Sequence, residues 1–233
     1  MKITRNNYKT IFAKISQIGI INTIRINFSY FKFKDAVKFP IIASRNLKIR
    51  KLGGKVKIFN LTTGCVQIGF DEISIFGCQK ERAIWDVHPE GNILFEGTAK
   101  FGNGCRICVM DRGRLVIGTT FYATAKTTFI CRNEIRIGKD VFFSWEILIM
   151  DSDFHPIYDN NGKCLNNNEA IVISDKVWVC CRSTILKGTK LPSGTIIAAG
   201  SVVNKKIDSP NSMYGGVPCR LLRTNVLWDY DFK

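Results

Sequence analysis

Histidine is the residue type of which this sequence has least. Only two of its 233 residues are histidines, His88 and His155. A catalytic zinc ion held by three histidines of one chain is therefore excluded. Acidic residues are also few, because 19 Asp and Glu stand against 34 Lys and Arg, which gives a formal net charge of +15. This excess favours anionic partners: phosphorylated cofactors, acidic glycans, nucleic acid or an anionic membrane surface.

Long apolar runs are missing as well. None approaches the roughly 18 residues of a membrane span, and the first residues contain no apolar segment followed by a small-residue cleavage site. We therefore expect a soluble, cytoplasmic protein whose nine cysteines are reduced thiols. The one CxxC motif, Cys105 to Cys108, lacks a second motif, and the vicinal pair Cys180-Cys181 has poor geometry for zinc, so we expect no metal site.

Aliphatic residues recur every six positions in the C-terminal half. The main series is Ile173, Val179, Ile185, Leu191, Ile197 and Val203. A second series, aliphatic or small, runs two residues ahead: Ile171, Val177, Ser183, Thr189, Thr195 and Ser201. Upstream the same spacing gives Ile117, Ala123 and Phe129, and then Ile137, Phe143 and Ile149.

A period of six fits neither an amphipathic helix nor a two-faced strand. It predicts a chain that turns a corner every six residues and closes triangular coils of 18, which stack into a parallel β-helix around a column of aliphatic side chains. Small residues just after the inward aliphatic, as in Ile68-Gly69, Ile117-Gly118 and Ile137-Gly138, are expected at the corners, where side chains crowd and unusual dihedrals arise. A β-sandwich with this spacing by chance is the alternative.

Three further stretches resemble a known family. They are residues 135–155, which end in Asp151-Ser-Asp-Phe-His155, residues 176–188, which contain Trp178, and residues 198–220, which end in Gly215-Gly-Val-Pro-Cys-Arg220. They are similar to the hexapeptide-repeat acyltransferases, most of all to the sugar and polysaccharide O-acetyltransferases of the galactoside and maltose type and those that modify capsules and O-antigens. The resemblance spans about residues 50–223. It implies an all-β, left-handed β-helix and a homotrimer with sites between adjacent prisms, and the handedness rests on the resemblance alone.

The chain divides into three parts on this interpretation. Residues 1–50 form an extension with an amphipathic, basic helix over residues 8–24 and strand-like lead-in segments after it. Residues 51–204 form the β-helix, interrupted by a protruding loop at 152–170 with turn composition. Residues 205–233 form a C-terminal extension. The helix either caps the first coil or docks on an anionic membrane.

Acyl transfer to a hydroxyl needs a base that removes the hydroxyl proton during attack, and histidine suits this best at neutral pH. The resemblance implies that His155 is this base. Asp153 is expected to orient it or to bind the acceptor. Asp151, Trp178 and Tyr122 are expected at the acceptor side, where Trp178 is either a pocket wall or a packing aromatic.

The acyl donor implied by the resemblance is acetyl-CoA, with no metal. A backbone N–H at Cys181 would stabilise the oxyanion. The remaining donor-side residues implied by the resemblance are Thr124, Ala199, Gly200, Asn204, Lys205, Arg220 and Arg223. Thr124 stands where the galactoside-type enzymes carry an asparagine near the thioester.

The acceptor is expected to differ from theirs, because Cys131-Arg-Asn133 replaces an acidic pair associated with their sugar. We predict an O-acetyltransferase for a carbohydrate hydroxyl in a capsular polysaccharide, an O-antigen or a lipid-linked glycan precursor. N-acetylation of an amino sugar and a non-catalytic glycan-binding scaffold remain alternatives. His88 is interpreted as a surface or turn histidine. No nucleic-acid-reading motif is present, so no nucleic-acid partner is expected.

Overall fold

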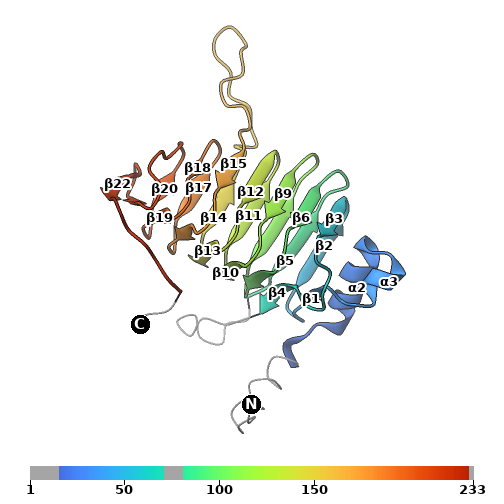
Figure 1. The fold of residues 1–233 in the computed structure, drawn as a ribbon. Helices are drawn as coiled ribbons and strands as arrows, with labels where there is room; N and C mark the ends of the chain where they lie inside the picture. The colour runs from blue at the N-terminus through green and yellow to red at the C-terminus, as the bar shows by residue number, and fades with distance from the viewer. Residues whose placement is uncertain (1–15, 71–80, 231–233) are drawn as a thin grey trace.

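The computed structural model describes residues 16–70 and 81–230, which form a prism of three parallel β-sheets with its ends at opposite sides of Figure 1. Successive strands enter successive sheets, so each circuit of the chain adds one strand to each wall. This is the parallel β-helix predicted from the period of six, with the left-handed course that the resemblance implies.

The three walls have nine, seven and six strands. The nine-stranded sheet contains β1 (Ile41–Ala43), β4 (Val66–Phe70), β7 (Ala99–Gly102), β10 (Phe121–Ala125), β13 (Phe142–Trp145), β16 (Trp178–Val179), β19 (Ile196–Ile197), β21 (Met213–Gly215) and β22 (Arg220–Arg223). The seven-stranded sheet contains β2 (Lys48–Leu52), β5 (Ile84–Val87), β8 (Arg106–Val109), β11 (Thr128–Cys131), β14 (Leu148–Met150), β17 (Thr184–Leu186) and β20 (Val202–Val203). The six-stranded sheet contains β3 (Lys55–Ile58), β6 (Asn92–Phe95), β9 (Arg114–Ile117), β12 (Glu134–Ile137), β15 (Ile171–Ile173) and β18 (Lys190–Leu191).

The prism interior is built from the predicted columns. Every member of both series between residues 171 and 203 is at most 1% exposed. In the middle turns the column changes from aliphatic to aromatic, with neighbouring ring centroids 5.3–6.2 Å apart. The rings belong to Phe95, Phe101, Phe121, Phe129 and Phe143. Burial of these side chains supplies the hydrophobic stabilisation that holds the short strands together.

The position of the corners differs from the one predicted. The left-handed backbone, with φ of 53–75°, lies three residues after the inward aliphatic and not directly after it. The positions are Thr120, Lys126, Asp140, Glu146, Lys176, Arg182, Gly188, Gly194 and Gly200. The glycines directly after the aliphatic serve close stacking instead, because a Cβ on Gly118 would collide with the backbone of Gly138 in the next turn. Of the three pairs named above, only Gly69 combines this place with a positive φ, of 84°.

The N-terminal part closes the first edge of the nine-stranded sheet. Helix α2 (Ile20–Tyr30) is followed by the short α3 (Phe33–Ala36), and residues 8–15 of the predicted helix lie outside the described residues. Helix α2 continues through residues expected to be extended, since Asn27 donates to the carbonyl of Ile41 and accepts from its N–H, at 2.7 and 3.1 Å. Tertiary contact with β1 thus overrides the local β-propensity. Among the described helices, none is both long and apolar enough to cross a bilayer.

The prism continues through β21, which pairs parallel with β19, so it extends beyond the predicted boundary at residue 204. It also begins before the predicted boundary at residue 51, because β1 and β2 lie in two of its walls. Strand β22 pairs antiparallel with β21. The chain then runs beside the outer face of the nine-stranded sheet (Figure 1), where the indole N–H of Trp228 donates to the carbonyl of Lys176 at 2.7 Å. This tail therefore packs on its own prism.

Candidate active site

The predicted catalytic loop leaves the prism at the corner where the seven-stranded sheet passes to the six-stranded sheet. We call this row of turns the loop vertex; it comprises residues 88–91, 110–113, 132–133, 151–170 and 187–189. The fourth turn extends far from the prism between β14 and β15, as the projecting loop in Figure 1 shows. Because the turns stack, residues far apart in the sequence become neighbours along this vertex. Asp151, for example, contacts Arg132, 19 positions away, and Asp153 contacts Lys187, 34 positions away.

Asp151 anchors the base of the loop. Its side chain is fully buried, and its two carboxylate oxygens accept the backbone N–H groups of Arg132 and Asn133 at 2.7 and 2.8 Å. Burial raises the pKa of the Asp151 carboxyl. Both oxygens are engaged with the preceding turn, so the structure places Asp151 as a support of the vertex and not at a surface open to an acceptor.

Asp153 and His155 are connected through main chain. The Asp153 carboxylate accepts from Lys187 Nζ at 2.6 Å and from Asn166 Nδ2 at 2.9 Å. Asn166 Nδ2 also donates to the His155 carbonyl at 2.9 Å, while the His155 N–H donates to the Asp153 carbonyl at 2.8 Å. The Lys187 ammonium group lowers the pKa of Asp153. Asp153 thus fixes the backbone that carries the exposed imidazole, and its carboxylate faces Lys187.

His155 lines a hollow of about 200 Å³ between the loop and the prism. The same hollow is bordered by Arg132, whose guanidinium carbon lies 5.9 Å from the ring centroid of Phe154. Among the described residues, no carboxylate is paired with Arg132. Its side chain is therefore free to bind an anionic group beside the imidazole.

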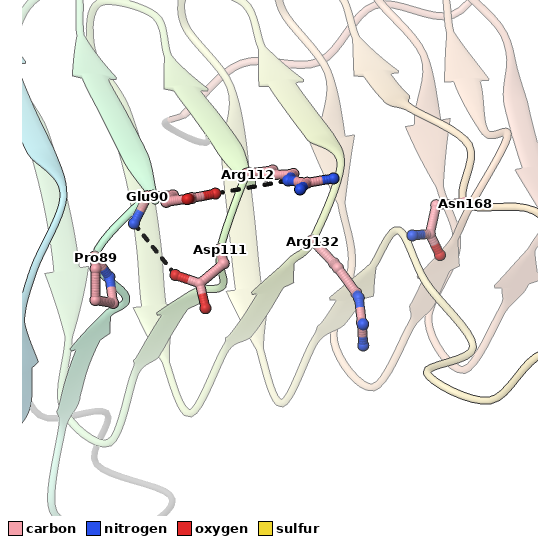
Figure 2. A pocket seen from close by; sticks show the side chains of 6 residues that line it. All are labelled: Pro89, Glu90, Asp111, Arg112, Arg132 and Asn168. Carbon is pink, nitrogen blue, oxygen red and sulfur yellow. Dashed lines mark hydrogen bonds and ion pairs between the residues drawn. The ribbon is translucent and has the colours of Figure 1, made fainter.

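A larger hollow of about 700 Å³ adjoins the first one, because Arg132 and Asn168 line both. Figure 2 shows its lining side chains, which follow successive turns of the vertex; they are Pro89, Glu90, Asp111, Arg112, Arg132 and Asn168. Arg112 pairs with Glu90 at 3.6 Å, which leaves Arg132 as the unpaired cation of the set. Together the two hollows form a polar track along the loop vertex.

The predicted oxyanion donor lies at another corner, between the nine- and seven-stranded sheets. The flanking residues Cys180 and Arg182 donate their N–H groups to Ile197 and Trp145 at 2.9 Å each. The N–H of Cys181 has no hydrogen-bond partner in the described part of the chain, as an oxyanion donor requires. Gly200 donates to the Cys181 carbonyl at 3.0 Å. Burial, together with the neighbouring Cys181, raises the pKa of the Cys180 thiol to about 12.

The other donor-side residues lie in four different places. Ala199 and Gly200 are exposed at the same corner as Cys181, and nothing lies within 4 Å of a Cβ built on Gly200. Asn204 and Lys205 are exposed directly after β20, at the end of the loop vertex. Arg220 and Arg223 are exposed on β22. Thr124, by contrast, is buried, and its hydroxyl has no hydrogen-bond partner among the described residues.

Tyr122 and Trp178 lie in one row on the outer face of the nine-stranded sheet. They flank Phe142 in the register of β10, β13 and β16. The tail covers this row, since the ring centroids of Trp178 and Trp228 are 5.9 Å apart. Trp178 also donates its indole N–H to the Ser144 hydroxyl at 3.1 Å. Within one chain, Trp178 is therefore a packing aromatic beneath the tail.

One chain thus groups His155, Asp153 and Asp151 at the loop vertex and Cys181, Ala199 and Gly200 at another corner. Sequence reasoning missed Lys187 and Asn166, whose roles depend on contacts 34 and 13 positions along the chain. In the sequence, Lys187 is only a lysine in a repeat turn and Asn166 is only an asparagine in a loop, so neither indicates a contact with Asp153. Arg132 was noted only as part of a stretch that departs from the galactoside-type pattern.

We compared the chain with known proteins. No family model matches the chain. The polysialic acid O-acetyltransferase of Neisseria meningitidis is 24% identical over 217 residues, which make up 91% of this chain and 88% of that protein. The galactoside O-acetyltransferase of Escherichia coli (strain K12) is 32% identical over 111 residues, 46% of this chain and 52% of that protein. The chain is thus similar over most of its length to one sugar O-acetyltransferase and over about half of its length to another.

A solved structure has the same fold. The crystal structure of the polysialic-acid-specific acetyltransferase NeuO superposes with a TM-score of 0.54 at 21% sequence identity, covering 83% of this chain and 79% of that one. This superposition shows a shared fold. The acceptor is argued below from the residues of this chain.

Proposed function

We propose that this protein is an acetyl-CoA-dependent O-acetyltransferase that modifies a carbohydrate hydroxyl of a capsular polysaccharide, an O-antigen or a lipid-linked glycan precursor. In the proposed reaction, His155 takes the proton of the acceptor hydroxyl while its oxygen attacks the thioester carbonyl. The backbone N–H of Cys181 stabilises the tetrahedral oxyanion. Collapse of this intermediate forms the acetyl ester, and the departing CoA sulfur receives the proton from the imidazolium.

The observation that carries the proposal is the setting of His155. Its backbone is fixed on both sides by hydrogen bonds to Asp153 and Asn166, while its ring is exposed in a polar hollow. A base on a rigid scaffold with an accessible ring has the geometry that general-base catalysis requires. The Neisseria and Escherichia relatives, which are 24% and 32% identical to the chain over the aligned residues, carry the name O-acetyltransferase.

Arg132 supports an acidic glycan as acceptor. Its unpaired guanidinium lines both the His155 hollow and the larger hollow, where it would bind a carboxylate or phosphate of the acceptor. The net charge of +15 would draw such a polymer to the surface. The Neisseria relative acts, by its name, on polysialic acid, an acidic polymer.

The separation of His155 and Cys181 supports a site shared between copies of the chain. We propose a homotrimer in which one protomer supplies His155 and its neighbour supplies Cys181 and the adjacent donor cleft. Exposed Arg220 and Arg223 would bind the phosphates of coenzyme A. Gly200, with open space beside it, would allow the pantetheine arm to approach the backbone.

Peripheral contact with an anionic membrane is a further part of the proposal. The outer face of α2 and α3 exposes Ile20, Ile21 and Phe33 by 69–75%, although Thr23 and Asn27 bind β1 on the inner face. The same segment also exposes Arg25, Lys32, Lys34 and Lys38. Such a surface would bring the enzyme to lipid-linked glycans.

The test is acetylation of a defined glycan panel. The protein is incubated with radiolabelled acetyl-CoA and with acidic polymers, their carboxyl-reduced neutral forms and amino sugars, and mass spectrometry locates the acetyl group. The proposal predicts a base-labile ester on an acidic polysaccharide and little product on its neutral form. A base-stable amide would indicate N-acetylation, and acetyl-CoA binding without transfer to any acceptor would indicate a non-catalytic scaffold.

A further inference from the structure

Three side chains of metal-binding types meet on the outer face of the seven-stranded sheet. Asp86 on β5 and His88 directly after it are two residues apart and therefore project to the same side. Cys108 on β8 is the register partner of Asp86. The carboxylate, imidazole and thiol donor atoms lie within 4.8 Å of one another. We propose that Asp86, His88 and Cys108 form a binding site for a divalent transition metal of the Zn²⁺ class.

An unsatisfied oxygen points to a missing ligand. Asp86 is only 8% exposed, and its Oδ1 has no hydrogen-bond partner in the described part of the chain. A buried carboxylate oxygen without a donor is unfavourable and calls for an ion or a donor. This oxygen lies 3.8 Å from His88 Nε2. Donors that share a tetrahedral Zn²⁺ at about 2.0–2.3 Å are separated by about 3.3–3.8 Å, so this pair already has a suitable spacing.

The second ring nitrogen of His88 has the partner that metal-binding histidines usually have. His88 Nδ1 lies 3.4 Å from Asp111 Oδ2. Asp111 is itself held by the Glu90 N–H at 3.2 Å, a contact drawn in Figure 2. A carboxylate at Nδ1 fixes the proton on that nitrogen and leaves the Nε2 lone pair for the metal.

Two basic residues border the cluster. Arg50 Nε lies 3.4 Å from Asp86 Oδ2 and so occupies the other carboxylate oxygen, leaving Oδ1 for the ion. Lys51 Nζ lies 3.1 Å from His88 Nε2 and would have to withdraw when a metal binds. Its side chain is exposed and flexible, so this displacement is easy. A carboxylate, a thiolate and a neutral imidazole would neutralise Zn²⁺.

The mixed donor set selects the class of metal. Thiolate and imidazole favour Zn²⁺ over Mg²⁺ and Ca²⁺, which prefer oxygen ligands. Three protein ligands leave a fourth position for water. The ion would join two successive turns of the prism and fix Asp111, which lines the larger hollow in Figure 2. Its expected role is to stabilise this wall.

Metal binding to the full-length protein provides the test. The protein is stripped with a chelator, reloaded with Zn²⁺ or Co²⁺, and analysed by mass spectrometry for metal content and by absorption spectroscopy. One metal per chain and a thiolate-to-Co²⁺ charge-transfer band are expected for the wild type. Cys164→Ser, which alters a partly exposed thiol in the loop, is the matched control and should keep both. Cys108→Ser should lose the band, and His88→Gln should lose the metal.

Asp111→Asn is a milder variant that keeps the three ligands. It should weaken Zn²⁺ affinity by about 10–100-fold without loss of the apo fold, which far-ultraviolet circular dichroism checks for every variant. A wild type without a stoichiometric metal, or a Cys108→Ser protein that retains the thiolate band, would refute the site and leave an ordinary ion-pair network. Since the readouts are metal content and spectrum, the result does not depend on acetyl transfer.

Discussion

At the scale of single residues, the loop vertex contains one residue with an exposed imidazole and others that hold its backbone in place. His155 has an exposed ring on a backbone held by its neighbours, while Asp153 is bound to Lys187 and Asn166. The sequence was enough to propose His155 as the base, because its residue type and its motif are local; that role stays a prediction. The partner of Asp153 could not be predicted, because Lys187 reaches it only after the loop has closed on the next turn.

The ion pair between Asp153 and Lys187 leads to a pH prediction. The pKa of Asp153 lies below its ordinary value of 3.8 in the folded protein, so the stabilisation of the loop is complete above that value and is lost as the pH falls through the lowered pKa. In Lys187→Met the pKa of Asp153 should rise, as carboxyl NMR titration can measure. Lys163→Met changes an exposed lysine of the same loop and should leave the titration unaltered. Identical titrations of wild type and Lys187→Met would show that Lys187 does not hold the carboxylate.

At the scale of the repeating turn, the period was predictable and the corner was not. The inward positions can be recognised in the sequence because their side chains are aliphatic or small, and all of them between residues 171 and 203 are buried as predicted. The corner residues with left-handed backbone cannot be recognised by residue type, because most of them are not glycine. Arg182 and Glu146, for example, both adopt positive φ and pair with each other at 2.8 Å. Contacts between turns thus compensate for backbone strain that glycine would avoid.

Two corner glycines test this account of the strain. Gly200→Ala should lower the free energy of unfolding by about 1 kcal/mol, because φ is 69° and the added Cβ meets nothing within 4 Å. Gly194→Ala should cost more, since its Cβ would also collide with the Asn211 side chain. Denaturant unfolding at fixed protein concentration measures both.

Gly200→Asn is the control for the first variant, because asparagine tolerates the left-handed region better than alanine. It should retain more stability than Gly200→Ala. Equal stabilities of wild type and both alanine variants would mean that the corners are not strained.

At the scale of the whole molecule, the walls of the prism could be predicted from one chain, whereas the assembled site could not. The fold follows from local periodicity, which any single chain contains. The predicted acid–base and oxyanion groups lie at different corners of one prism, and only a second copy could bring them together. The sequence contains no pattern that specifies how two exposed corners meet.

Mixed oligomers test the shared site. His155→Ala and Arg220→Ala proteins are unfolded together in equal amounts, refolded and assayed at limiting acetyl-CoA. If each site takes His155 from one protomer and Arg220 from its neighbour, about a quarter of the sites should be intact in random trimers. Activity should then exceed the mean of the two separate variants. A mixture that only reproduces this mean would contradict the shared site.

The most direct test of the central claim is the turnover number of His155→Ala with acetyl-CoA and an acidic glycan acceptor. Asn160→Ala, an exposed change in the same loop, serves as the control for a disturbed loop. With the imidazole exposed and its backbone contacts retained, the melting temperature should stay near that of the wild type. The account predicts that turnover falls by about 100-fold or more in His155→Ala and stays near wild type in Asn160→Ala. Unchanged turnover in a folded His155→Ala protein would contradict it.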